Sequence, residues 1–157
     1  ATITGLWVAY GIWRDRAVLD VDVVIGYAQR YPRGDALRSS PELDIDEIDS
    51  DTRLIVRARN VGRRSVVLSE GGFQTDHRKF SFMGEGLGKE LPKKLGEGEK
   101  FDTWTYLLAF KERRSQELNP TLKAYWQTEA GQVYKTGLPR NLIRFFLEPL
   151  TGGGNSA

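Results

Sequence analysis

Short segments in which apolar and polar side chains alternate are the feature that most constrains how this chain can fold. In the segment RLIVRAR, residues 53–59, Leu54, Val56 and Ala58 point to one side and the residues between them, mostly arginines, point to the other. The segment AVLDVDVVIGYAQ, residues 17–29, alternates in the same way. A period of two residues is typical of a strand that buries one face, so both segments are predicted to be half-buried β-strands.

Turn residues separate about seven segments of this kind, and their spacing predicts an all-β fold, an antiparallel β-sandwich. Asn60 and Gly62 are expected to join residues 53–59 to the segment SVVLSEGGFQT, residues 65–75, as a β-hairpin. Both turn residues tolerate the left-handed backbone that tight connections require. A second hairpin is expected around residues 129–131, Glu-Ala-Gly.

Three further segments predict other local structure. The segment FDTWTYLLAF, residues 101–110, carries bulky side chains on both faces, as in a central strand or a covered sheet. The segment LLAFKERRSQEL, residues 107–118, predicts a short helical piece. Residues 28–51 contain two prolines and seven acidic residues, and they predict a long surface connection.

Length, cysteine content and charge exclude several classes of protein. A chain of 157 residues is the size of one domain and is long enough to bury a real core. Because the chain has no cysteine, disulfides, thiolate metal sites and thiol catalysis are excluded. The formal net charge is only +2, so phosphate binding is not expected to be the main work of the domain.

The first residues are apolar and aromatic, and the charges follow them. Residues 1–13 carry no charge, and the run ends with aromatic and basic side chains typical of the end of a membrane span: Trp7, Tyr10, Trp13, Arg14 and Arg16. Thirteen residues are too few to cross a bilayer alone. Residues 1–16 are therefore interpreted as a membrane-helix remnant, a docking arm or a first buried element. As a membrane helix, they would place the domain on the cytoplasmic side.

Three motifs, in order, resemble the immunoglobulin-like sandwiches of small bacterial membrane-anchored proteins. The motifs are VRARNVGRRSVVLSEGGF, LPKKLGEGEKFDTW and LKAYWQTEAGQVYKT, and the resemblance covers roughly residues 17–137. It implies an antiparallel sandwich of about seven strands over residues 17–150, preceded by a single membrane helix. A short C-terminal extension and a flexible tail, residues 151–157, complete the expected organisation. The resemblance brings no catalytic residues and no cofactor.

The sequence offers little for catalysis or for metal binding. The single histidine, His77, lies between Asp76 and Arg78 in an expected loop, where no partner or pocket is evident. With one histidine and no cysteine, the catalytic triads and zinc sites have too few members. Acidic residues 44, 46, 49 and 51 lack the glycine turn and the bidentate glutamate of an EF-hand. The chain is therefore predicted not to be an enzyme, with no metal, cofactor or small-molecule substrate.

Two groups of side chains are candidates for contacts with a partner. One is the apolar and aromatic C-terminal segment, and the other is the arginine-rich connection after residue 56; the candidates are Leu142, Ile143, Phe145, Phe146, Arg57, Arg59, Arg63 and Arg64. Three hypotheses follow: a membrane-tethered, non-catalytic protein-interaction module, a structural subunit of a larger assembly such as a virion or appendage, and a nucleic-acid binder that uses the arginines. The expected partner is another protein or a second copy of the chain.

Overall fold

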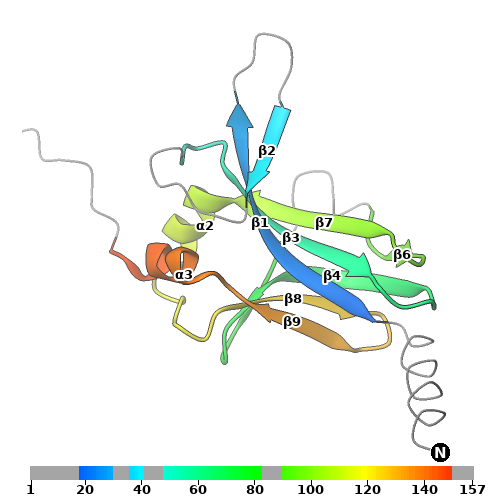
Figure 1. Ribbon diagram of the computed structural model, residues 1–157. Helices are drawn as coiled ribbons and strands as arrows, with labels where there is room; N and C mark the ends of the chain where they lie inside the picture. Colours follow the sequence, from blue (N-terminus) through cyan, green and yellow to red (C-terminus); the bar gives the residue numbers. More distant parts are fainter. Residues whose placement is uncertain (1–17, 30–35, 41–47, 83–89, 150–157) are drawn as a thin grey trace, which may run out of the picture.

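Two antiparallel β-sheets lie face to face with the hydrophobic core between them (Figure 1). The computed structural model describes residues 18–29, 36–40, 48–82 and 90–149, and it confirms the all-β sandwich. Sheet A has the strand order β2 (Ala36–Ser40), β1 (Leu19–Gln29), β3 (Arg53–Asn60) and β7 (Lys100–Tyr106). Sheet B has the order β5 (Lys79–Ser81), β4 (Val66–Gln74), β8 (Lys123–Thr128) and β9 (Val133–Gly137), and β6 (Lys93–Leu95) also pairs with β4.

The alternation along β1 and β3 has the predicted effect. Leu54, Val56 and Ala58 of β3 are fully buried between the sheets, whereas the arginines between them lie on the outer face of sheet A. Trp126 of β8 faces them from sheet B, and its indole N–H donates a hydrogen bond of 3.3 Å to the backbone carbonyl of Val56. This bond joins the two sheets at the centre of the core.

The expected hairpin between β3 and β4 is wrong, because these two strands lie in different sheets. Neither Asn60 nor Gly62 has a positive φ; within the described residues only Gly98 and Gly131 do. Asn60 is instead fully buried, and its amide donates to the backbone carbonyls of Arg64 and Leu95 while its side-chain oxygen accepts from the Gly62 N–H. These bonds hold the connection that crosses from one sheet to the other.

Three other expectations need correction, and two are confirmed. The described residues form nine strands, so a count of about seven is not confirmed. Part of the expected surface connection is a strand, since β2 pairs with the end of β1. Strand β7 lies at the edge of sheet A among the described strands, not at its centre. The hairpin between β8 and β9 is confirmed, with Gly131 at φ +84°, and helix α2 (Leu107–Arg114) forms where a helical piece was expected.

The sandwich has two distinct ends. At the proximal end β1 begins, beside the connection 61–65 and the turn 129–131; the Val61 N–H donates to Val18, and the Glu129 N–H donates to Val67. At the distal end, helices α2 and α3 (Arg140–Leu147) lie next to the turn 75–78 (Figure 1).

Candidate functional site: the distal end of the sandwich

Helix α3 closes the core at the distal end with one of its faces. Leu142 and Phe146, one helical turn apart, are almost fully buried. The Phe146 ring packs edge-on against Phe73 of β4 and Phe110 of α2, with centroid distances of 6.0 and 5.5 Å. Leu142 and Phe146, which the sequence predicts as partner-binding residues, are covered here by the sandwich itself.

The other face of α3 keeps apolar side chains outside the core. Ile143 and Phe145 are half-buried, and Leu147 is 42% exposed. Ile143, Leu147 and Pro149 line a shallow hollow of about 440 Å³, which Arg140, Arg144 and Glu148 border. Four residues of this helix were predicted to contact a partner. Two of them, Ile143 and Phe145, thus remain partly accessible.

Lys111 of α2 lies beneath this face and is unusual for a lysine. It is only 5% exposed, and its ammonium group lies 4.2 Å from the centroid of the Phe145 ring. Burial lowers the pKa of Lys111, and the nearby carboxylate of Glu148 opposes that shift. The lysine therefore holds α2 and α3 together through its stem and its charge. No periodic pattern in the sequence predicts this burial, because lysine is expected on a solvated face.

A groove of about 370 Å³ lies where α2 meets β5 and β7, which are the edge strands of the two sheets among the described strands. Its apolar lining is aromatic, and Phe80 and Phe82 both pack against Phe110 with centroid distances of 5.7 and 5.4 Å. Ser81, Thr105 and three basic residues complete the lining; the basic residues are Lys79, Arg113 and Arg114. No acidic residue lines this groove among the described residues.

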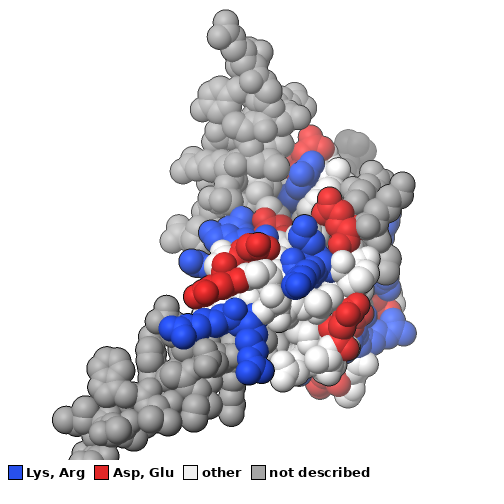
Figure 2. Space-filling model, turned by 90° about the vertical axis from the view of Figure 1, so that its right-hand side faces the viewer, with Lys and Arg blue, Asp and Glu red and all other residues white. Residues whose placement is uncertain are grey.

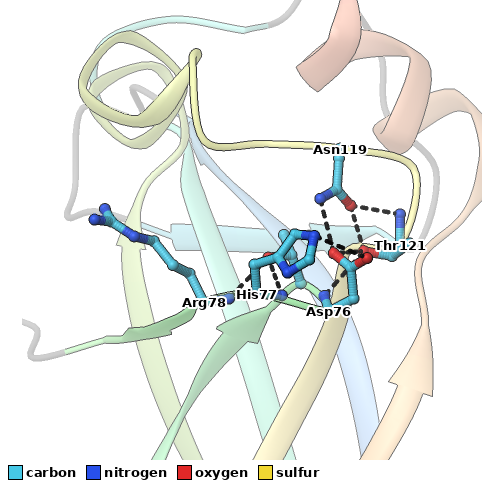
Figure 3. Close-up of polar contacts among 6 residues, drawn as sticks. Asp76, His77, Arg78, Asn119 and Thr121 are labelled. Carbon is cyan, nitrogen blue, oxygen red and sulfur yellow. Dashed lines mark hydrogen bonds and ion pairs between the residues drawn. The ribbon is translucent and has the colours of Figure 1, made fainter.

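The turn 75–78 is ordered by hydrogen bonds rather than by burial (Figure 3). The Asp76 carboxylate accepts hydrogen bonds of 3.0 Å from the Asn119 amide and the Thr121 hydroxyl, and the Asp76 N–H donates to that hydroxyl. These two side-chain bonds lower the pKa of Asp76. The Thr75 hydroxyl accepts from the backbone N–H groups of His77 and Arg78, which fixes the next residues of the turn.

His77 itself points into solvent, as an exposed loop histidine was expected to do. Its side chain is 82% exposed, and Nε2 lies 3.4 Å from the Asp76 carboxylate. The adjoining hollow is open and is bordered by Lys123 and Lys135, with Asp76 as the one carboxylate that lines it among the described residues. A general base needs a desolvated, oriented partner, and this arrangement provides none.

The predicted arginines do not act as one group. Arg57 forms a two-bond pair with Asp102 of β7, at 2.9 and 3.1 Å, and that hydrogen bond raises the pKa of Arg57. Arg59 is exposed on the outer face of sheet A, and Arg63 and Arg64 lie in the proximal connection. Figure 2 shows basic and acidic side chains mixed over the proximal end, where exposed Glu97, Glu99 and Glu129 also lie. The described part of this end therefore has no continuous basic patch.

The outer face of sheet A carries an aromatic pair that sequence reasoning did not assign to a site. Trp104 and Tyr106 of β7 pack edge to face at 5.1 Å, and the guanidinium of Arg53 lies 4.2 Å from the Trp104 centroid. Both contacts follow from the strand register, because Ile55 lies opposite Trp104 and Arg53 lies opposite Tyr106. The bulky side chains on both faces of the segment 101–110 are the sequence feature that could have indicated this pair.

The remaining predictions concern the N-terminus and metal binding. Trp7, Tyr10, Trp13, Arg14 and Arg16 lie outside the described residues, as does the tail after Pro149. Across the described ranges, none of the helices has the length and apolar character needed to cross a bilayer, and no cluster of three metal-ligating side chains occurs. Comparison of the chain with protein-family models, curated proteins and solved structures gives no match.

Proposed function

We propose that this protein is a non-catalytic protein-interaction module that is tethered to a membrane through its apolar N-terminal segment and binds a partner at its distal end. The observation that carries the proposal is that α3 has two apolar faces, one buried in the core and one in contact with solvent. Leu142 and Phe146 close the core, and Ile143 and Leu147 keep a second apolar strip in contact with solvent. A single amphipathic helix of a monomer needs only the first strip, so the second strip is available for another protein.

The arrangement of the two ends supports this proposal. The apolar segment 1–16 precedes β1, which begins at the proximal end, whereas α3 lies at the distal end (Figure 1). A tether at the first end would leave the second end directed away from the membrane surface. The arginines that follow the apolar run favour the cytoplasmic side for the domain.

The charges around the hollow on α3 indicate the chemistry of the partner surface. Arg140 and Arg144 border it, and the described residues give these two guanidinium groups no ion pair. A complementary protein surface would present an apolar ridge that fits between Ile143 and Leu147, with acidic side chains beside it. We therefore commit to an acidic, apolar protein surface as the occupant of this hollow.

Photo-crosslinking in living cells tests this proposal. A photoreactive phenylalanine at position 147 should give a discrete adduct with one protein, and Arg144→Glu should abolish the adduct because it reverses the charge beside the hollow. The matched control is the same probe at Val133, which is also exposed but lies on β9 away from α3. An adduct that is equally strong at both positions, or that survives the charge reversal, would overturn the proposal.

The immunoglobulin-like type of the sandwich is a second part of the proposal. In that fold, the first, second and fifth strands share one sheet, and the third, sixth and seventh share the other. The orders β1-β3-β7 and β4-β8-β9 support this assignment, with β5 beside β4 as an added edge strand. The crossing from β3 to β4 between the sheets is also consistent with it. An experimental structure with β9 paired in sheet A would contradict the type.

A structural subunit of a larger assembly is the second candidate function, and the β1–β2 ribbon favours it. Beyond Gly26, β1 pairs only with β2, and β2 is the last strand of sheet A among the described strands. A two-stranded ribbon is marginal alone and presents unpaired backbone groups to another chain. Light scattering of the purified chain decides between the functions: a concentration-independent monomer disfavours the assembly, and a discrete oligomer that a proline at Leu37 or Arg38 dissociates supports it.

A further inference from the structure

We propose that the groove between the edges of β5 and β7 binds an extended acidic segment of the partner, with one carboxylate on Arg113 and an apolar side chain on the aromatic floor. This inference rests on the proposed function, because it names a second contact made by the same kind of partner. It concerns a different surface from α3, so the two can be tested apart.

The floor of the groove is rigid and apolar. Phe80, Phe82 and Phe110 are almost fully buried, and their rings meet edge to face, which leaves little freedom for them to move. Ala109 of α2 also lines the groove with a small side chain. A volume of about 370 Å³ with such a lining accommodates a branched or aromatic side chain of a ligand.

The basic side chains around the groove are not equivalent. Lys79 is occupied on the outer face of sheet B, where its ammonium donates to Gln127 at 3.0 Å and lies 3.7 Å from the Glu70 carboxylate. Arg114 bonds to Glu117 at 3.3 Å and lies over the Phe80 ring. Arg113 has no ion pair, hydrogen bond or ring contact with any described residue.

Arg113 is therefore the cation that remains for an incoming anion. Its position in the last turn of α2 suits its charge to the helix dipole, which explains a basic residue there without a ligand. The helix dipole does not explain why the groove beside Arg113 lacks acidic residues and has an aromatic floor. A carboxylate carried next to an apolar side chain satisfies both features at once.

The groove also selects for an extended ligand. Strands β5 and β7 are the last strands of their sheets on this side among the described strands, so each turns an unpaired backbone edge toward the groove region. Thr105 lies along the same lining, and a hydroxyl group can bond to a ligand backbone. An extended peptide places alternate side chains on the floor and toward Arg113.

The test is fluorescence anisotropy with the full chain and a labelled peptide of sequence GEFDIDG. We expect saturable binding, and at least about fivefold weaker binding for the amide counterpart GQFNING, as expected for loss of the upper range of an exposed ion pair. Arg113→Gln should weaken binding of the acidic peptide by a similar factor and leave the amide peptide unaffected. Ala109→Trp, which fills the groove, should abolish binding of both peptides.

Arg59→Gln is the matched control, because Arg59 is an exposed arginine on the outer face of sheet A, away from the groove. Equal weakening by Arg59→Gln and Arg113→Gln would mean only general attraction of an acidic peptide and would overturn the inference. The inference would also be overturned if the acidic peptide showed no saturable binding to the unmutated chain, provided that circular dichroism shows this chain to be folded. If the peptide fails while the adduct at position 147 persists, only the groove is wrong; if the peptide behaves as expected and the adduct is absent, only the α3 surface is wrong.

Discussion

At the scale of single residues, two adjacent glycines of β4 allow its neighbours in sheet B, β5 and β8, to pack closely against it. A Cβ on Gly71 would lie 2.6 Å from the Trp126 ring, and a Cβ on Gly72 would lie 2.0 Å from the backbone carbonyl oxygen of Phe80. Because a backbone atom cannot rotate away as a side chain can, Gly72 permits the pairing of β4 with β5. The lack of a side chain here is thus a condition for the strand order, and not a sign of flexibility.

We expect Gly72→Ala to lower the free energy of unfolding by about 2–4 kcal/mol, because β5 must move away from β4. Urea unfolding followed by tryptophan fluorescence measures the change. Gly137→Ala is the control, since a Cβ there meets nothing within 4 Å. A Gly72→Ala protein as stable as the Gly137→Ala protein would show that β5 is not packed on β4 as described.

The pKa of Asp76 is held below its ordinary value, chiefly by the hydrogen bond from Asn119. A carboxyl group with a lowered pKa in the folded state stabilises the fold above its unfolded pKa of about 3.9, and this contribution is lost as the pH falls through the folded pKa. We expect Asn119→Ala to raise the pKa of Asp76 more than His77→Gln does, because His77 makes a smaller contribution. Carboxyl ¹³C NMR titration measures both, and the reverse order would contradict the geometry of the turn.

Tyr125 should ionise late in an alkaline titration, since burial, with help from Glu70, raises its pKa to about 12. Its hydroxyl is buried, and the Ser81 side chain beside it opposes the shift. A raised folded pKa stabilises the protein below the unfolded value of about 10, and that contribution is lost as the pH rises toward about 12. We expect Tyr125→Phe to remove the last absorbance step at 295 nm and to reduce alkaline destabilisation; an unchanged step would place the late titration elsewhere.

At the scale of elements, the sequence predicts what local periodicity determines. Strand β3 follows from its alternation, and α2 follows from a run of good helix formers. The pairing of β3 with its chain neighbour could not be predicted, because the buried Asn60 sends the chain to the other sheet through bonds to residues 4 and 35 positions away. Strand β2 was not predicted because its own residues have a weak β-propensity. It is a strand because it pairs with β1.

In helix α3, two leucines allow the contribution of the buried face to stability to be measured apart from that of the exposed face. Leu142 is 1% exposed and Leu147 is 42% exposed on the same eight-residue helix. We expect Leu142→Ala to lower the free energy of unfolding by about 2–4 kcal/mol, and Leu147→Ala to change it by less than about 0.5 kcal/mol. Chemical denaturation of both variants measures the difference. Similar losses at the two positions would mean that Leu147 also belongs to the core and is not available to a partner.

At the scale of the whole molecule, the candidate site could not be predicted from the sequence because it has no continuous segment. The distal end joins the turn 75–78, helix α2 and helix α3. These segments are separated along the chain by 28 residues (79–106) and 25 residues (115–139), and they meet only when the sheets stack. The sequence did indicate an apolar C-terminal segment that needs a cover. It could not divide that segment into a face for the core and a face for solvent.

The positions of the proximal and distal ends also predict the orientation of the domain on a membrane to which its N-terminus is attached. The chain has no cysteine, so a single introduced cysteine can carry a fluorophore without background labelling. We expect Glu129→Cys, in the proximal turn, to be strongly quenched by acceptor lipids when the full chain is bound to vesicles through an N-terminal histidine tag on nickel lipids. Leu147→Cys, at the distal end, should be quenched much less. Because the tag and the fluorophore chemistry are the same for both proteins, the ratio of the two signals depends only on orientation. Equal quenching would mean that the domain lies flat or tumbles, and a tether at its N-terminus would then not present the distal end to a partner.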